Sequence, residues 1–139
     1  MVELPAGMVD DGTFGGSAAQ EVKEELGLEI PESELVNLSE LAITPSGEEE
    51  GEDKLPQAVF MSPGGSDEFL PLFLHQKTVK RETLKDWTGK LTGEREKGEK
   101  ITLKLVKLNE LWKEGGRDAK ALAAWAMYEG LKREGKLKL

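Results

Sequence analysis

The chain of 139 residues contains no cysteine and a single histidine, His75. Without cysteine there can be no disulfide, no thiolate metal site and no thiol nucleophile. A reducing compartment suits this composition, and we expect a cytoplasmic protein. His75 ends an apolar stretch, so a hydrogen-bonded structural role is expected for it before a role in binding a base or a phosphate.

Long apolar runs are also lacking. No stretch of 18 apolar residues is present, which excludes a typical membrane-spanning helix. The N-terminal stretch MVELPAGMVDDG has neither the basic region nor the apolar region of a secretory signal. We therefore expect no membrane partner.

Positive charge is scarce in the first half of the chain. Residues 1–70 hold 17 acidic residues and only two lysines, a net charge of −15, whereas residues 71–139 carry +7, which gives −8 in total. The acidic half argues against nucleic-acid binding and suits divalent cations. The basic half either meets phosphate or neutralises the acidic half within the fold.

The hydrophobic pattern predicts one α+β domain over residues 1–139, with an exposed charged loop at 46–54. The longest helix, expected over residues 117–136, should begin near Asp118 and bury Leu122, Trp125, Ala126 and Leu131. Helices are expected at residues 17–27, 108–115 and 117–136, and strands at residues 2–5, 34–44, 57–62, 68–77 (interrupted by Pro71) and 99–108.

Three glutamates crowd the helix expected at QEVKEELGL, with Ser17 as its N-cap and Gly27 at its end. Glu21, Glu24 and Glu25 stand at i, i+3 and i+4, so their carboxylates should share one face. Like charges at this spacing repel in water, but a hard divalent cation such as Mg²⁺ reverses the sign of the interaction. The spacing alone leaves open a plain solvated acidic face.

The residues around this helix, LPAGMVDDGTFGGSAAQEVKEELGL, resemble the signature of the Nudix hydrolases. ELPAGM and the later SPGGSDE (residues 62–68) resemble the branch of this superfamily that hydrolyses nucleoside-diphosphate sugars. The residues that match the signature are Gly7, Glu21, Val22, Glu24, Glu25, Gly27 and Leu28.

The resemblance implies a Nudix-type α/β/α sandwich with a mixed sheet. It also implies a Mg²⁺ or Mn²⁺ ion held by the carboxylates of Glu21, Glu24 and Glu25 and by the backbone carbonyl of Ala6, with Glu24 and Glu25 as catalytic residues. The implied reaction is hydrolysis of the diphosphate of a nucleotide sugar, such as ADP-ribose or ADP-glucose, to a nucleoside monophosphate and a sugar phosphate.

Two further segments offer site residues by the same resemblance. In SPGGSDE, Gly64, Gly65 and Glu68 are expected to contact substrate, because a glycine turn lets the backbone approach a ligand closely. In TGEREKGEK, the base that orients water is expected to be Glu96, ahead of Glu94 and Glu99. The alternative for this second segment is a solvated hairpin tip. Trp87, in a loop, could stack on a nucleobase but is expected to be a packing residue.

The sequence departs from the family pattern in two places. Gln20 stands where the family has an arginine. No glutamate stands at the place of the signature's early glutamate, where Asp10, Asp11 or Thr13 occupies the turn instead. The usual N-terminal strands are also not present ahead of Gly7, so a second copy or another partner is expected to complete the sheet, with a homodimer favoured. These departures support a rival interpretation, a Nudix-fold nucleotide-binding or regulatory module with little or no turnover. A nucleoside triphosphate or dinucleoside polyphosphate substrate is a third alternative, against which SPGGSDE speaks.

Overall fold

The computed structural model describes residues 1–9, 12–45, 54–94, 96 and 98–137. Its mixture of helices and short strands confirms the α+β class. Part of the charged loop predicted at 46–54, and Asp10 and Asp11, lie outside the described residues. The α-helices are α1 (Phe14–Glu21), α2 (Leu38–Ala42), α3 (Arg81–Trp87), α4 (Leu111–Glu114) and α5 (Ala119–Arg133), with the shorter turns η1 (Val22–Leu26), η2 (Glu32–Glu34) and η4 (Leu108–Glu110).

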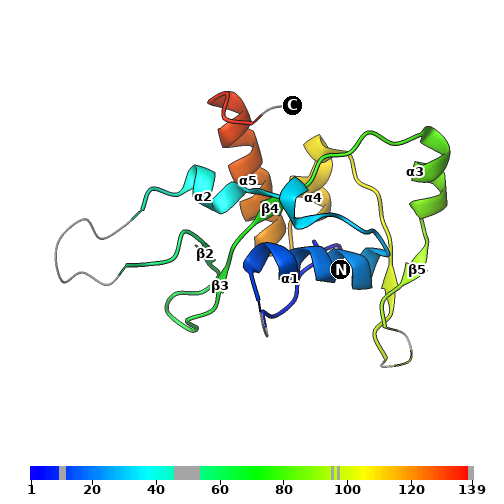
Figure 1. The fold of residues 1–139 in the computed structure, drawn as a ribbon, viewed down its shortest axis with the longest axis horizontal. Coiled ribbons are helices and arrows are strands. Elements are labelled where there is room, and N and C mark those ends of the chain that lie inside the picture. The colour runs from blue at the N-terminus through cyan, green and yellow to red at the C-terminus, as the bar shows by residue number, and fades with distance from the viewer. Residues whose placement is uncertain (10–11, 46–53, 95, 97, 138–139) are drawn as a thin grey trace.

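The strands form three separate antiparallel pairs. They are β1 (Val36–Asn37) with β4 (Phe73–Leu74), β2 (Val59–Phe60) with β3 (Phe69–Leu70), and β5 (Leu91–Thr92) with β6 (Ile101–Thr102). The mixed sheet of the expected sandwich is therefore not present within the described residues. Figure 1 shows α1 running across the lower centre of the molecule, with β2 and β3 towards one side and α3 and β5 at the other.

The strand predicted over residues 34–44 is wrong beyond its first residues. The chain pairs only at Val36–Asn37 and then turns into α2. The side chain of Asn37 accepts a hydrogen bond from the Glu40 backbone N–H at 3.1 Å, which is the usual N-cap interaction. This local cap outweighs the weak alternation on which the strand prediction was based.

Other predicted strands are shorter than expected. Pro71 divides the segment 68–77 into β3 and β4, as its missing N–H predicts. Residues 2–5 form no strand, and of residues 99–108 only Ile101–Thr102 pair as a ladder. Each of these segments instead finds single hydrogen-bond partners, such as the bond from the Leu103 N–H to the Lys90 carbonyl at 2.8 Å.

The core lies where α5 crosses the β4 segment and α2. Leu38, Leu72 and Leu131 form its buried centre. The Ser39 hydroxyl, fully buried, accepts a hydrogen bond from the Leu72 N–H at 2.9 Å and so joins α2 to the β3–β4 connection. These contacts fix the C-terminal helix against the middle of the chain.

Helix α5 starts at its predicted cap, since the Asp118 side chain accepts from the Lys120 N–H. Its buried stripe is one position away from the prediction. Leu131 is buried as expected, but Leu122 is 39% exposed and Ala126 is exposed, whereas Ala121 and Tyr128 are buried. Trp125 is half-buried against Trp112. No helix in the described part of the chain is both long and apolar enough to cross a membrane.

Helix α1 begins earlier than predicted. Thr13, and not Ser17, is the N-cap, and its hydroxyl accepts from the Gly16 N–H at 3.0 Å. The helix then widens into the π turn η1 and ends at Gly27, whose φ of 69° is left-handed. Glycine adopts this conformation without strain, which confirms Gly27 as the end of the helix.

Candidate active site

The N-terminal segment of residues 3–7 is held beside the glutamate helix by the start of α5. The Leu4 N–H donates to the Asp118 carboxylate at 3.1 Å. Lys120 forms ion pairs with Asp118 at 3.1 Å and with Glu3 at 3.3 Å. Asp118 is buried and the Lys120 side chain is only 16% exposed, so this cluster ties the two ends of the chain together.

Gly7 lies directly against the carboxylate of Glu21. A Cβ added to Gly7 would stand 1.7 Å from Oε1 of Glu21, far inside van der Waals contact. The absence of a side chain at position 7 therefore leaves the space that the Glu21 carboxylate occupies. This contact brings the signature's glycine and its first matching glutamate together, next to the backbone of Ala6.

Two cavities meet at this N-terminal segment. One, which we call the Glu21 cavity, has a volume of about 530 Å³ and is bounded by Gly7, Glu21, Glu68 and the apolar residues of α1 and β3–β4. The other, the Glu25 cavity, has a volume of about 810 Å³ and is bounded by Glu25, Glu99 and the β6 segment. Leu4, Pro5, Ala6 and Lys120 line both.

Glu25 lies in a negative environment. Its partial burial, followed by the charges of Glu21, Glu99 and Glu3, raises the pKa of its carboxyl from 4.5 to about 7, while Lys120 opposes this shift. A carboxylate that is hard to ionise among other carboxylates is a candidate site for a cation. Burial disfavours the Lys120 charge, but its contacts with Asp118 and Glu3 outweigh burial and raise the pKa of its ammonium group.

Glu24 points away from these two cavities. It is exposed, lines neither of them and accepts a hydrogen bond from the Gln20 side-chain amide. The π turn explains this, since it places more residues in each turn than an α-helix and rotates positions three apart further from each other. Glu21, Glu24 and Glu25 thus do not share one face, contrary to the expectation from α-helical spacing.

The donors near Ala6 fit a hard divalent cation in kind. Glu21, Glu25 and the backbone carbonyl of Ala6 offer oxygen atoms, which Mg²⁺ and Mn²⁺ prefer. Within the described residues, however, no three His, Asp or Glu side chains stand close enough to hold one ion together. The roles of Ala6, Glu21, Glu24 and Glu25 as metal ligands remain predictions.

Of the three residues predicted to contact substrate, the structure places one in a cavity and two outside both cavities. Glu68 lines the Glu21 cavity, but Gly64 and Gly65 line neither cavity and stand in an exposed turn closed by hydrogen bonds to the Ser62 carbonyl. His75 lines the Glu21 cavity and is 2.9 Å from a Glu34 carboxylate oxygen, so it has the expected hydrogen-bonded role.

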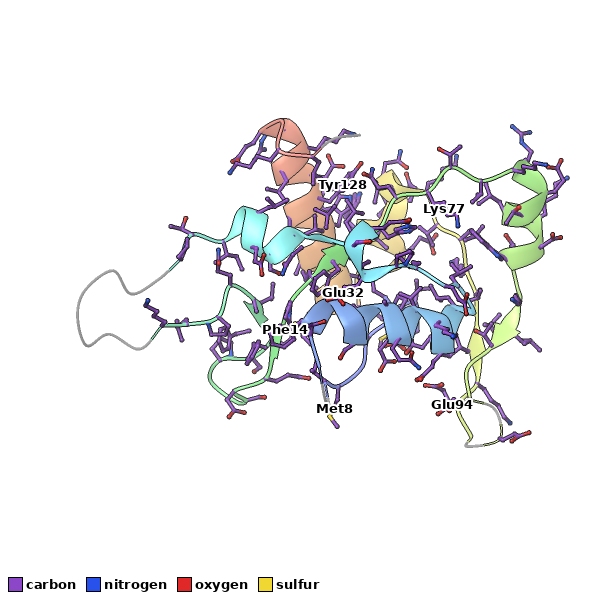
Figure 2. The ribbon with its side chains drawn as sticks, viewed as in Figure 1. Met8, Phe14, Glu32, Lys77, Glu94 and Tyr128 are labelled. Carbon is purple, nitrogen blue, oxygen red and sulfur yellow. The ribbon has the colours of Figure 1, made fainter. Side chains whose placement is uncertain are left out.

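The β5–β6 hairpin places Glu99, rather than Glu96, beside Glu25. Glu96 is exposed and lines neither cavity, whereas Glu99 lines the Glu25 cavity and accepts from the Glu94 N–H at 2.9 Å. In Figure 2, Phe14 lies at one end of the helix formed by α1 and η1, and Glu94 lies near its other end. Glu96 as the base remains a prediction.

Sequence reasoning missed Glu3, Asp118 and Lys120 as neighbours of the site. Asp118 was expected only as a helix cap, and nothing local links it to Leu4, which is 114 residues away. The one available signal was an acid at a helix start followed two residues later by a lysine, which is common on protein surfaces and therefore carries little information.

A carboxylate set with a buried lysine between two cavities defines a site suited to an anionic substrate held through a cation. Along the sequence, the chain is 39% identical over 137 residues to Nudix hydrolase 14, chloroplastic, of Arabidopsis thaliana. The match covers 97% of this chain and 41% of that protein, so the chain spans about two fifths of its relative's length. No family model and no solved structure matches the chain. Over nearly its whole length the chain is thus similar to part of a protein named as a Nudix hydrolase.

Proposed function

We propose that the chain is a Nudix-type hydrolase that cleaves the diphosphate of a nucleoside-diphosphate sugar, such as ADP-ribose or ADP-glucose, with a divalent metal ion. The observation that carries the proposal is the direct contact of Gly7 with the Glu21 carboxylate, whose charge also acts on Glu25. These are signature residues, and the similarity to a plant Nudix hydrolase spans them. The branch of the superfamily is proposed from ELPAGM and SPGGSDE.

In this proposal Glu21, Glu25 and the Ala6 carbonyl would hold Mg²⁺ or Mn²⁺, and Glu24 would join them by leaving its hydrogen bond with Gln20. When bound, such an ion neutralises phosphate charge and acidifies the attacking water. Glu21 is positioned against Gly7, and burial, followed by the charges of neighbouring carboxylates, raises the pKa of Glu25 to about 7, which a bound cation would reverse. Lys120 keeps segment 3–7 against the helix through Glu3 and Asp118.

Water attack at phosphorus forms one P–O bond and breaks the bond to the bridging oxygen, which leaves as a phosphate monoester. The attacking water gives up its proton to a base. Glu99 is our first choice for this base because it lines the same cavity as Glu25, and Glu96, on the same hairpin, is the second. The products are AMP and a sugar phosphate.

The test is AMP release from ADP-ribose and ADP-glucose with Mg²⁺, Mn²⁺ or EDTA. The proposal expects release that needs the metal and falls by about 100-fold or more in Glu25→Gln, as expected when a metal ligand of the transition state is lost. Glu129→Gln, on α5 and away from both cavities, is the matched control and should keep full activity. If no AMP were released from any nucleotide sugar with either metal ion, the proposal that the chain is an enzyme would be rejected.

A second candidate is a binding or regulatory module of the same fold. Gln20 favours it, because its amide bonds Glu24 without the charge that an arginine would bring. Metal-dependent binding of ADP-ribose without AMP release would support this candidate over the enzyme. A completed sheet, through a homodimer or through the rest of a longer chain, fits either candidate and remains a proposal.

A further inference from the structure

The Glu25 cavity is lined by one aromatic side chain, Trp87, together with its carboxylates. Trp87 is the last residue of α3 and is half-buried. The aromatic pairs found within the described residues are Phe14–Phe69, Phe60–Phe69 and Trp112–Trp125, so no other ring in that part of the chain packs on Trp87. Because Trp87 is only half-buried and lines the cavity, part of its side chain borders the space that a ligand would enter.

Trp87 is joined to the segment that carries Glu99 by hydrogen bonds of the β5–β6 hairpin. The Lys90 N–H donates to the Trp87 carbonyl at 3.1 Å. The Gly89 N–H donates to the Leu103 carbonyl, and the Leu103 N–H donates to the Lys90 carbonyl, both at 2.8 Å. The same hairpin carries Glu99. The indole and the Glu99 carboxylate are therefore carried by one connected piece of backbone, whereas Glu25 and Glu3 reach the cavity from the glutamate helix and the N-terminal segment.

Three lysines line the cavity, and two of them are paired. Lys104 forms an ion pair with Glu114 at 2.5 Å, and Lys120 pairs with Asp118 and Glu3. For Lys100, no carboxylate of the described residues lies within ion-pair distance. Lys100 is therefore the lysine of this cavity that is left to meet an anion from solution.

We propose that the Glu25 cavity binds the nucleoside monophosphate half of the substrate, with its nucleobase stacked on Trp87 and its phosphate facing Lys100. The inference rests on the proposed function for the identity of the substrate. Base stacking on an aromatic ring, a cation for phosphate and carboxylates for a bridging metal are the three contacts that a nucleotide needs. The volume of about 810 Å³ lies within the usual range of small-molecule sites.

The Glu21 cavity suits a base less well. Of the phenylalanines that line it, Phe14 packs on Phe69 with ring centres 5.9 Å apart, whereas Phe73 is in none of the aromatic pairs of the described residues. Its one lysine, Lys120, is engaged in ion pairs. Within the described residues, the Glu25 cavity combines an aromatic ring with a lysine outside ion pairs, so the nucleotide is assigned to it.

Calorimetric titration with AMP, adenosine and ribose 5-phosphate, in EDTA and again in Mg²⁺, tests this assignment without requiring turnover. Trp87→Ala should weaken the binding of AMP and of adenosine by about 10-fold or more, which is the usual effect of losing one stacking ring. The affinity for ribose 5-phosphate should stay unchanged. Trp87→Phe, which keeps a ring, should recover most of the loss and shows that the fold is intact. Trp112→Ala, at a tryptophan that lines neither cavity, is the matched control.

Lys100→Met should weaken the binding of AMP and of ribose 5-phosphate by a few-fold and leave the affinity for adenosine unchanged. Lys77→Met, outside both cavities, should change none of these affinities. Equal AMP affinity in Trp87→Ala and Trp112→Ala would overturn the assignment, as would no AMP binding under either condition. AMP binding that depends on Trp87, in a protein that releases no AMP from nucleotide sugars, would reject the proposed reaction but uphold the site.

Discussion

The Glu25 carboxyl has a pKa of about 7 in the folded chain because it is partly buried and faces Glu21, Glu99 and Glu3. The folded state therefore binds a proton more tightly than the unfolded state, whose carboxyl titrates near 4.5. The contribution of Glu25 to stability is most favourable below pH 4.5 and is lost as the pH rises to about 7. Replacing Glu25 by glutamine should remove this pH dependence.

Thermal unfolding in EDTA at about pH 5 and about pH 8 measures the effect. Glu25→Gln should raise the melting temperature relative to the wild type more at the higher pH than at the lower one. Glu129→Gln, away from the acidic cluster, is the control and should not. An unchanged pH dependence in Glu25→Gln would show that the carboxylates around position 25 do not interact as the structure indicates.

Gly7 tests the position of a single carboxylate. Gly7→Ala places a methyl group where the Glu21 carboxylate lies, and the flexible glutamate must move away. We expect little change in stability but a loss of about 100-fold in hydrolysis, the scale expected when a site group moves by about 1 Å. Gly64→Ala is the control, because a Cβ there meets nothing within 4 Å. Full activity of Gly7→Ala with ADP-ribose would show that Glu21 is not positioned through Gly7.

The positions of single residues could be predicted where the residues are close in the sequence. The i, i+3, i+4 spacing placed three glutamates on one helix, but the π turn separated Glu24 from the other two. Glu99 and Lys120 enter the site through tertiary contacts, which no local pattern encodes. The choice of Glu96 over Glu99 rested on loop position alone, and the direction of each side chain depends on the packing of the hairpin.

Among the elements, the start of α5 is the one on which the arrangement of the site depends. Asp118 caps this helix, binds the Leu4 N–H and pairs with Lys120. Asp118→Ala removes all three interactions and leaves Lys120 poorly compensated, so we expect a loss of about 2–4 kcal/mol in the free energy of unfolding. Urea denaturation measures this loss.

Thr13→Ala supplies the comparison, because this exposed cap of α1 should cost only about 1 kcal/mol. Asp118→Ala should also speed amide hydrogen exchange at Leu4, whose N–H loses its acceptor. Equal stability losses in the two variants, with unchanged exchange at Leu4, would show that segment 3–7 is held by something other than Asp118.

The start of α5 and the end of η1 were predicted correctly, whereas the start of α1, the helices α2 and α3 and most strands were not. Asp118 and Gly27 act locally, so the start of α5 and the end of the π turn follow from the sequence. The stripe of α5 was placed one position off because the face that is buried depends on how α2 and the β4 segment pack on it. The strands extend over only two residues each, since their pairing is set by distant partners.

For the whole molecule, the charge is divided between an acidic first half and a basic second half, and the fold brings the two together at Glu3, Asp118 and Lys120. The charges of Glu21, Glu99 and Glu3 still contribute to raising the pKa of Glu25 after its burial, in spite of the opposing charge of Lys120. A cation that binds these carboxylates stabilises the folded state by mass action, by about 2.7 kcal/mol at 100 times its dissociation constant. Saturating Mn²⁺ should therefore raise the melting temperature by roughly 5–10 °C.

This increase should be lost in the double variant Glu21→Gln, Glu25→Gln and kept in Glu129→Gln. Differential scanning fluorimetry with Mn²⁺ against EDTA gives the comparison. A rise of the same size in the double variant would place the cation elsewhere on the molecule.

Anomalous diffraction from crystals soaked in Mn²⁺ tests the role of the glutamate helix most directly. The predicted result is a manganese peak bound by the carboxylates of Glu21 and Glu25, beside the backbone of Ala6. A well-ordered helix with no peak at these side chains would contradict the hydrolase, even if the chain shares its fold with Nudix proteins.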